Sequence, residues 1–99
     1  MHHTVDQPRS GSVVRLERGD TLELLLRQRS ARHDWQVAMA PFGMDLLEDA
    51  PRRGTPGAAS MRRLMFRVMR DGGGILRLER NHPYEERAER LDLLVAVGR

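Results

Sequence analysis

The sequence contains no cysteine and no lysine, and each absence narrows what the chain can do. Without cysteine it cannot form a disulfide, use a catalytic thiol or bind a metal through thiolates. All 17 basic residues are arginine, and against 14 acidic residues they leave a net charge of +3. Arginine binds carboxylates and phosphates alike, but so small an excess of positive charge is a weak argument for nucleic-acid binding.

Long apolar runs are also missing. The longest, residues 93–97, is far too short to cross a bilayer, so we expect no membrane association. The first residues lack the basic start and apolar stretch of a signal peptide, and we expect a cytoplasmic monomer. With 99 residues the chain fits one domain. We expect the polar residues 1–11 to be a flexible arm and residues 12–99 to be the domain.

Apolar and polar residues alternate in most of the chain, which is the pattern of half-buried strands. The strands predicted in this way lie at 13–16, 21–26, 35–39, 44–47, 75–79 and 91–97. Asp71 and the three glycines at 72–74 predict a turn. Trp35 falls on an inward face, and we predict that it lies at the centre of the core. The neighbours expected for it are Leu24, Phe66, Leu78 and Leu93.

Residues 61–70 fit two patterns. Met61, Leu64, Met65 and Val68 have helical spacing, and their propensities favour a helix. Residues 64, 66 and 68 also alternate as a strand would. With a strand here, six or seven short strands follow one another at the spacing of an all-β sandwich. An α+β fold with a helix over 61–70 is the alternative.

No arrangement of side chains predicts catalysis or metal binding. Ser30, His33 and Asp34 fall within one polar segment and do not form a nucleophile motif. The four histidines are scattered without metal-ligand spacing. A free amine followed by His3 could wrap Cu²⁺ or Ni²⁺, but an incidental histidine-containing start is the simpler interpretation. We therefore expect a protein that is not an enzyme and that has no cofactor and no metal.

The segment around residues 80–86 is the most informative loop. It joins two alternating segments, so it lies at an end of the predicted sandwich. Pro83 stiffens it, and Tyr84 offers a large contact surface at low entropic cost. The alternative is that Tyr84 folds back and caps the core.

Several of these stretches together resemble the chagasin family of cysteine-protease inhibitors. They are Gly-Asp-Thr-Leu at 19–22, Trp-Gln-Val at 35–37, Leu-Arg-Leu-Glu at 76–79 and His-Pro-Tyr-Glu at 82–85. The resemblance covers about residues 12–97. It implies an immunoglobulin-like β-sandwich of about seven strands, with a strand over 61–69. It also implies that three loops at one end of the sandwich block the active-site cleft of a papain-like protease.

The family's loop motifs match this chain unevenly. Its Arg-Pro-Trp motif corresponds to His-Pro-Tyr at 82–84, and its glycine-rich loop corresponds to residues 55–60, which contain one glycine. Its Asn-Pro-Thr-Thr-Gly motif is replaced at 29–34 by a segment with two arginines, so we predict weak or absent inhibition. The partner-binding residues that the resemblance implies are Arg29, Ser30, Ala31, Arg32, His33, Pro56, Gly57, Ala58, His82, Pro83, Tyr84 and Glu85.

Two further functions stay open at this point. One is a divergent scaffold that binds the acidic surface of another protein through Arg29 and Arg32 without inhibiting a protease. The other is a small basic nucleic-acid-binding protein that uses the cluster Arg27, Arg29 and Arg32. A titration of papain separates inhibition from simple binding, and salt-dependent binding of DNA or RNA would support the last function.

Overall fold

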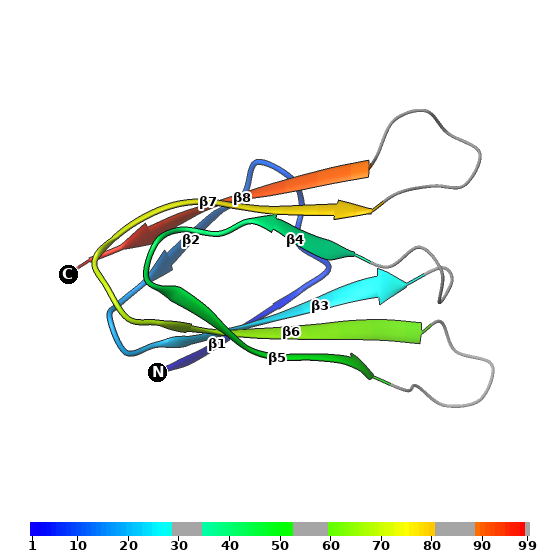
Figure 1. Cartoon of the computed structure of the whole chain (residues 1–99), viewed down its shortest axis with the longest axis horizontal. Helices are drawn as coiled ribbons and strands as arrows, with labels where there is room; N and C mark the ends of the chain where they lie inside the picture. Colours follow the sequence, from blue (N-terminus) through cyan, green and yellow to red (C-terminus); the bar gives the residue numbers. More distant parts are fainter. Residues whose placement is uncertain (29–34, 53–59, 81–88, 99) are drawn as a thin grey trace.

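The computed structural model describes residues 1–28, 35–52, 60–80 and 89–98, which form eight strands in two facing sheets (Figure 1). The first sheet has the order β1-β3-β6-β5, built from His2–Asp6, Thr21–Gln28, Ser60–Val68 and Met44–Arg52. The second has the order β2-β8-β7-β4, built from Val13–Leu16, Glu89–Val97, Gly72–Arg80 and Gln36–Met39. The described ranges contain no helix that is long and apolar enough to cross a membrane. The predicted all-β sandwich is confirmed.

The core lies between the two sheets and follows the alternation in the sequence. Every second residue of the central strands points inward and is buried. The innermost side chains are Leu22, Leu24, Leu26, Leu64, Phe66, Val68, Leu76, Leu78 and Leu93. Burying one such side chain contributes about 1.5–3 kcal/mol, so this interior layer is the main stabilising feature of a domain that has no disulfide.

The ambiguous segment forms strand β6, as the family resemblance implied. Leu64 and Val68 are 0% exposed and Phe66 is 1% exposed, so the period-two pattern faces the core. In the register with β3, Leu64 lies opposite Leu24 and Phe66 lies opposite Leu22. Burial on one face of a sheet outweighs the helical propensity of this segment. The alternative of a helix over 61–70 is wrong.

A chain of polar contacts crosses the outer face of the first sheet. The Thr4 hydroxyl donates to Glu23 Oε1 at 3.2 Å. Arg63 forms an ion pair with Glu23 and a second one with Glu48 Oε2 at 3.1 Å. These residues come from β1, β3, β6 and β5, so one network links all four strands, including both edges. Contacts of this kind stabilise the pairing of neighbouring strands.

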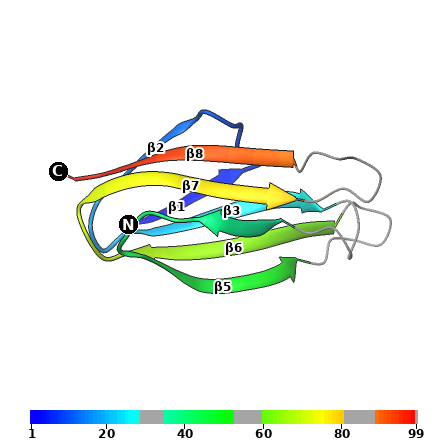
Figure 2. The same cartoon turned by 45° about the horizontal axis from the view of Figure 1, so that its top comes forward.

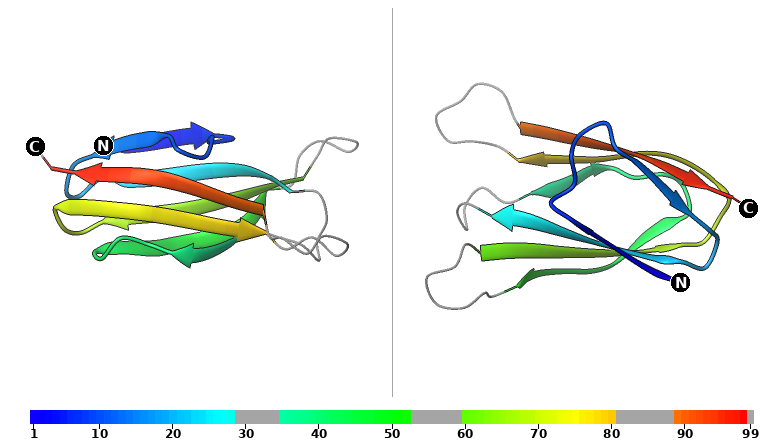
Figure 3. Two further views of the ribbon diagram at one scale, coloured as in Figure 1. Left: turned by 90° about the horizontal axis from the view of Figure 1, so that it is seen from above. Right: turned by 180° about the vertical axis from the view of Figure 1, so that it is seen from behind.

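The expectation of a flexible arm over residues 1–11 is wrong. His2–Asp6 pairs in parallel with β3, and Val5 packs against the core. The chain then crosses to the second sheet, where β2 pairs in parallel with β8 (Figure 3, right). Along this crossing, the Gln7 amide donates to Leu25 O at 2.8 Å and the Gly11 amide donates to Asp92 O at 2.7 Å. The added β1 also brings the number of described strands to eight, against the seven expected.

The three glycines at 72–74 were predicted to form a turn, but they begin strand β7. The chain reverses just before them, at residues 70–71. Gly73 has a φ of 99°, and a Cβ built on it would lie 2.0 Å from the Val95 carbonyl oxygen. Glycine in a strand often marks such a close approach of another backbone. The glycines therefore permit tight pairing with β8.

Strand β5 is longer than predicted. It continues beyond residue 47 to Arg52, where the sequence indicated a long loop. A register shift between Leu46 and Glu48 separates its two parts. Pro51 lies within it, which the fold tolerates because β5 is an edge strand. The proline and the interrupted alternation concealed this strand in the sequence.

Candidate functional site

Three ranges, 29–34, 53–59 and 81–88, connect strand ends that all lie at one end of the sandwich. The paired residues at that end are Gln28 with Ser60, Arg52 with Met61, Gln36 with Glu79 and Arg80 with Glu89. Figures 1 and 2 show these strand ends together, and Figure 1 shows the N-terminus and the end of β8 at the opposite end. The family resemblance implied three loops at one end of the sandwich, and the strand ends that flank the three ranges do lie together there.

The sequence-predicted binding residues themselves lie outside the described residues. They are Arg29, Ser30, Ala31, Arg32 and His33 in the first range, Pro56, Gly57 and Ala58 in the second, and His82, Pro83, Tyr84 and Glu85 in the third. Asp34, the third residue of the serine, histidine and aspartate group, also lies outside them. The described part of the site consists of the side chains at the strand ends.

Arg80 is the central side chain of this end. It is the last residue of β7, and it continues inward the alternation of Leu76 and Leu78. It is only 7% exposed. Its Nη1 donates to the Arg27 carbonyl oxygen at 3.3 Å, and its Nη2 forms an ion pair with Glu89. The guanidinium thus contacts residues at the end of β3 and at the start of β8.

Trp35 completes this arrangement. The guanidinium carbon of Arg80 lies 4.7 Å from the centroid of the Trp35 ring, within cation–π range. The indole Nε1 donates to the Arg27 carbonyl oxygen at 3.3 Å, so that one oxygen accepts from both side chains. Trp35 is 5% exposed and belongs to the same buried core as its four predicted neighbours. Its burial is confirmed, but its predicted central position is wrong: Trp35 precedes β4, at the end of the core.

A hollow of about 270 Å³ lies beside these side chains. Residues of the crossing between β1 and β2 contribute to its wall. Its lining includes Gln7, Pro8, Trp35, Arg80, Glu89 and Leu91. Arg80 was expected at the start of the 80–86 loop but ends strand β7, and neither Arg80 nor Glu89 was among the predicted site residues. The signal was present, since an arginine at an inward-facing strand position requires a partner.

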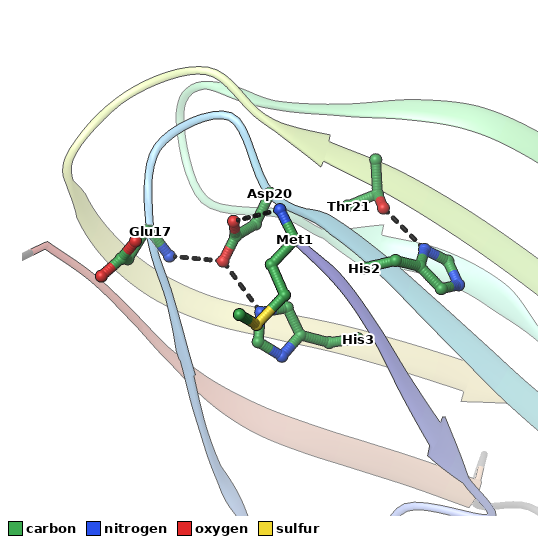
Figure 4. Close-up of polar contacts among 6 residues, drawn as sticks. All are labelled: Met1, His2, His3, Glu17, Asp20 and Thr21. Atoms are coloured by element: carbon green, nitrogen blue, oxygen red, sulfur yellow. Dashed lines mark hydrogen bonds and ion pairs between the residues drawn. The ribbon is translucent and has the colours of Figure 1, made fainter.

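A second polar cluster occupies the opposite end of the sandwich (Figure 4). The Asp20 carboxylate accepts from the Glu17 amide at 2.9 Å and pairs with His3 Nε2 at 2.8 Å and with the amine of Met1 at 3.1 Å. The Glu17 hydrogen bond, followed by those from His3 and Met1, lowers the pKa of Asp20 to about 2. A larger hollow of about 450 Å³ lies beside this cluster, away from the three connections. The cluster anchors β1 to the turn before β3.

The histidines of β1 have partners in the fold. His2 Nδ1 lies 2.6 Å from the Thr21 hydroxyl, and His3 pairs with Asp20. Within the described ranges, no group of three or more His, Asp or Glu side chains is arranged to hold a metal ion. His33 and His82 lie outside those ranges.

Comparison with known proteins identifies the fold. No protein-family model and no curated protein matches the chain. Two solved structures share its two-sheet β-sandwich architecture over nearly its whole length. One is the crystal structure of EhICP2, a cysteine protease inhibitor from Entamoeba histolytica, with a TM-score of 0.79 and 17% identity. The alignment with EhICP2 covers 98% of this chain and 95% of the EhICP2 chain. The other is the solution structure of amebosin, with a TM-score of 0.69, 15% identity and 99% coverage of both chains.

Proposed function

We propose that this chain is a chagasin-like inhibitor of papain-like cysteine proteases, which blocks the active-site cleft with its segments 29–34, 53–59 and 81–88. One observation supports this most. The strand ends that flank the three segments converge at one end of a sandwich that shares its fold with EhICP2, a cysteine protease inhibitor. The sequence resembles the same kind of inhibitor at residues 19–22, 35–37, 76–79 and 82–85.

Inhibition by occlusion needs no nucleophile and no metal. A rigid surface that fills the cleft gains affinity because few degrees of freedom are lost on binding. Tyr84 supplies the apolar anchor, since rigid aromatic side chains often dominate binding energy, and Pro83 restricts the backbone beside it. The protein acts as a monomeric binding domain and not as an enzyme.

The residues at 29–34 determine how strong the inhibition is. The family has small residues in this loop, which allow its backbone to approach the protease closely, whereas this chain has Arg29 and Arg32. We therefore expect an inhibition constant weaker than nanomolar. The same arginines favour a protease whose cleft has an acidic rim, because complementary charge increases the association rate.

A steady-state assay tests the proposal. The purified chain is titrated against papain and a cathepsin with a fluorogenic peptide substrate, and trypsin serves as the control from another protease class. We expect competitive inhibition of the cysteine proteases and none of trypsin. If the folded protein inhibits neither cysteine protease at micromolar concentrations, the proposal is wrong. Salt-dependent binding of DNA or RNA in a parallel titration would then favour the nucleic-acid function.

A further inference from the structure

The guanidinium of Arg80 lies between the attachment points of two of the three segments. Segment 29–34 follows the end of β3 and is followed by Trp35, while segment 81–88 runs from Arg80 to Glu89. Arg80 contacts Trp35 and Glu89, which flank these segments, and Arg27, the residue before the last residue of β3. It donates to the Arg27 carbonyl oxygen at 3.3 Å, lies 4.7 Å from the centroid of the Trp35 ring and forms an ion pair with Glu89.

We propose that Arg80 is a positioning residue, which fixes the relative placement of the strand ends that carry segments 29–34 and 81–88. The proposal rests on the inhibitor function proposed above, because it explains how two separate segments are presented as one surface. A binding surface is effective when its supporting side chains are held by packing and hydrogen bonds beneath it. Arg80 meets this condition, since it is only 7% exposed and is held by the Arg27 carbonyl, the Trp35 ring and Glu89.

The contacts of Arg80 serve geometry more than stability. A buried charge costs free energy, and replacing it with an apolar side chain of similar volume is often neutral or stabilising. Its partner Glu89 has a side chain that is 54% exposed, so solvent can satisfy that carboxylate when the pair is lost. An apolar side chain could also pack on Trp35. It could not donate to the Arg27 carbonyl or hold Glu89, and a planar guanidinium does both with a fixed geometry.

The chain offers a matched control on the same strand. Arg77 also lies on β7 and pairs with a carboxylate of β8, since its Nε donates to Asp92 Oδ1 at 2.9 Å. It contacts neither Arg27 nor Trp35 in the described contacts. Arg80→Met and Arg77→Met therefore make the same chemical change and break the same kind of ion pair between the same two strands. They differ in whether the attachment points of the segments lose their common contact.

The experiment compares the wild type, Arg80→Met, Arg80→Lys and Arg77→Met in three measurements. These are the inhibition constant for papain, the thermal unfolding midpoint, and the NMR order parameters of the backbone amides at 27–28, 35–36 and 89–90. For Arg80→Met we expect an inhibition constant about tenfold or more weaker, as for the loss of a hydrogen bond from a charged group. We also expect lower order parameters at these amides in a protein that still melts cooperatively. Lysine, a point charge without the planar fork, should restore only part of the inhibition.

Two results would overturn the inference. One is an Arg80→Met protein whose inhibition constant and order parameters equal those of the wild type. The other is an equal weakening in Arg77→Met, which would show that any lost ion pair between β7 and β8 has the same effect. If the wild type does not inhibit papain, the proposed function fails, and the order parameters alone decide the role of Arg80. Lower values in Arg80→Met but not in Arg77→Met support it, and unchanged values refute it.

Discussion

The Trp35 ring packs against the guanidinium of Arg80, with the guanidinium carbon 4.7 Å from the ring centroid. Trp35 is the only tryptophan in the chain, so its fluorescence reports on this one place. The pair lies where the core ends and the strand ends of the candidate site begin. Its indole also donates to the Arg27 carbonyl, so the ring has both an apolar and a polar role. These two roles can be separated by substitution.

Trp35→Ala should lower the free energy of unfolding by about 3–5 kcal/mol, the usual range for a large aromatic residue removed from a core. Trp35→Phe keeps most of the apolar contact and removes the hydrogen bond to Arg27, so it should cost about 1 kcal/mol from the lost bond. Urea unfolding followed by far-UV circular dichroism measures both variants, since neither retains the tryptophan signal. Similar losses for the two variants would mean that the hydrogen bond, and not the ring, provides the stability.

Much of the fold could be predicted because a half-buried strand alternates apolar and polar residues in the sequence. This alternation correctly predicted the buried positions of Leu22, Leu24 and Leu26 and those of Leu76 and Leu78. Strand β1 was not, because its short alternation has only Val5 as an apolar inward residue, and its edge position is stabilised by contacts with distant residues such as Asp20 and Glu23. Sequence patterns detect what a segment buries, but not which distant side chain it meets.

Gly73→Ala tests the close approach of β7 and β8. A Cβ at this position would lie 2.0 Å from the Val95 carbonyl oxygen, and the φ of 99° is strained for any side chain. Gly72 has a similar φ of 111°, but a Cβ there would meet nothing within 4 Å. We expect a loss of about 1–2 kcal/mol for Gly72→Ala from backbone strain alone. Gly73→Ala should lose more, by about 1–3 kcal/mol for the added clash.

Thermal or urea unfolding of the two glycine variants gives the comparison. The difference between them isolates the steric contact, because both share the positive φ. If Gly73→Ala and Gly72→Ala are equally stable, the two backbones are not as close as the structure has them, and the strand ends there must pair differently.

Asp20 should contribute to the acid limb of the stability curve. Its pKa is lowered from 3.8 to about 2 by the Glu17 amide first, and then by His3 and the Met1 amine. A carboxylate with a lowered folded-state pKa stabilises the fold above its unfolded pKa, and this contribution is lost as the pH falls through the folded value. Wild type should therefore lose it between about pH 4 and pH 2.

Asp20→Asn removes this contribution. We expect the variant to be less stable than wild type at neutral pH, with the difference shrinking as the pH falls from about 4 towards 2. Glu23 and Asp92 also have lowered pKa values, caused chiefly by Arg63 and Arg77, but both are present in the two proteins and cancel in the difference. Chemical unfolding of both proteins at a series of pH values measures the difference in their free energies of unfolding. A difference that does not change with pH would show that Asp20 acts through uncharged hydrogen bonding alone.

The candidate site was predictable only in part. Chain order was enough to place the three connections at one end, because successive antiparallel strands return alternate connections to the same side. The supporting contacts of Arg80 could not be predicted, because Arg27 and Glu89 come from other strands and the Arg27 contact is made through a backbone oxygen. Every residue has a backbone carbonyl, so the residue types in a sequence do not show which carbonyl will accept a hydrogen bond.

Tyr84 is the predicted apolar anchor of the binding surface, and Tyr84→Ala tests that role. The chain has four aromatic residues. Trp35 and Phe66 are buried in the core. Phe42 is 79% exposed in the turn between β4 and β5, and this turn lies at the opposite end of the sandwich from the candidate site (Figure 1).

If Tyr84 anchors the partner, its truncation should weaken inhibition of papain by roughly 2 kcal/mol or more, with little change in the unfolding midpoint. Phe42→Ala is the matched control, since it also removes an aromatic side chain, and Phe42 is exposed with the guanidinium carbon of Arg70 4.7 Å from its ring centroid. It should leave the inhibition constant unchanged, because it lies away from the converging strand ends. A Tyr84→Ala protein that unfolds would instead identify Tyr84 as a cap on the core, and equal inhibition by the two variants and the wild type would exclude an anchoring role for either ring.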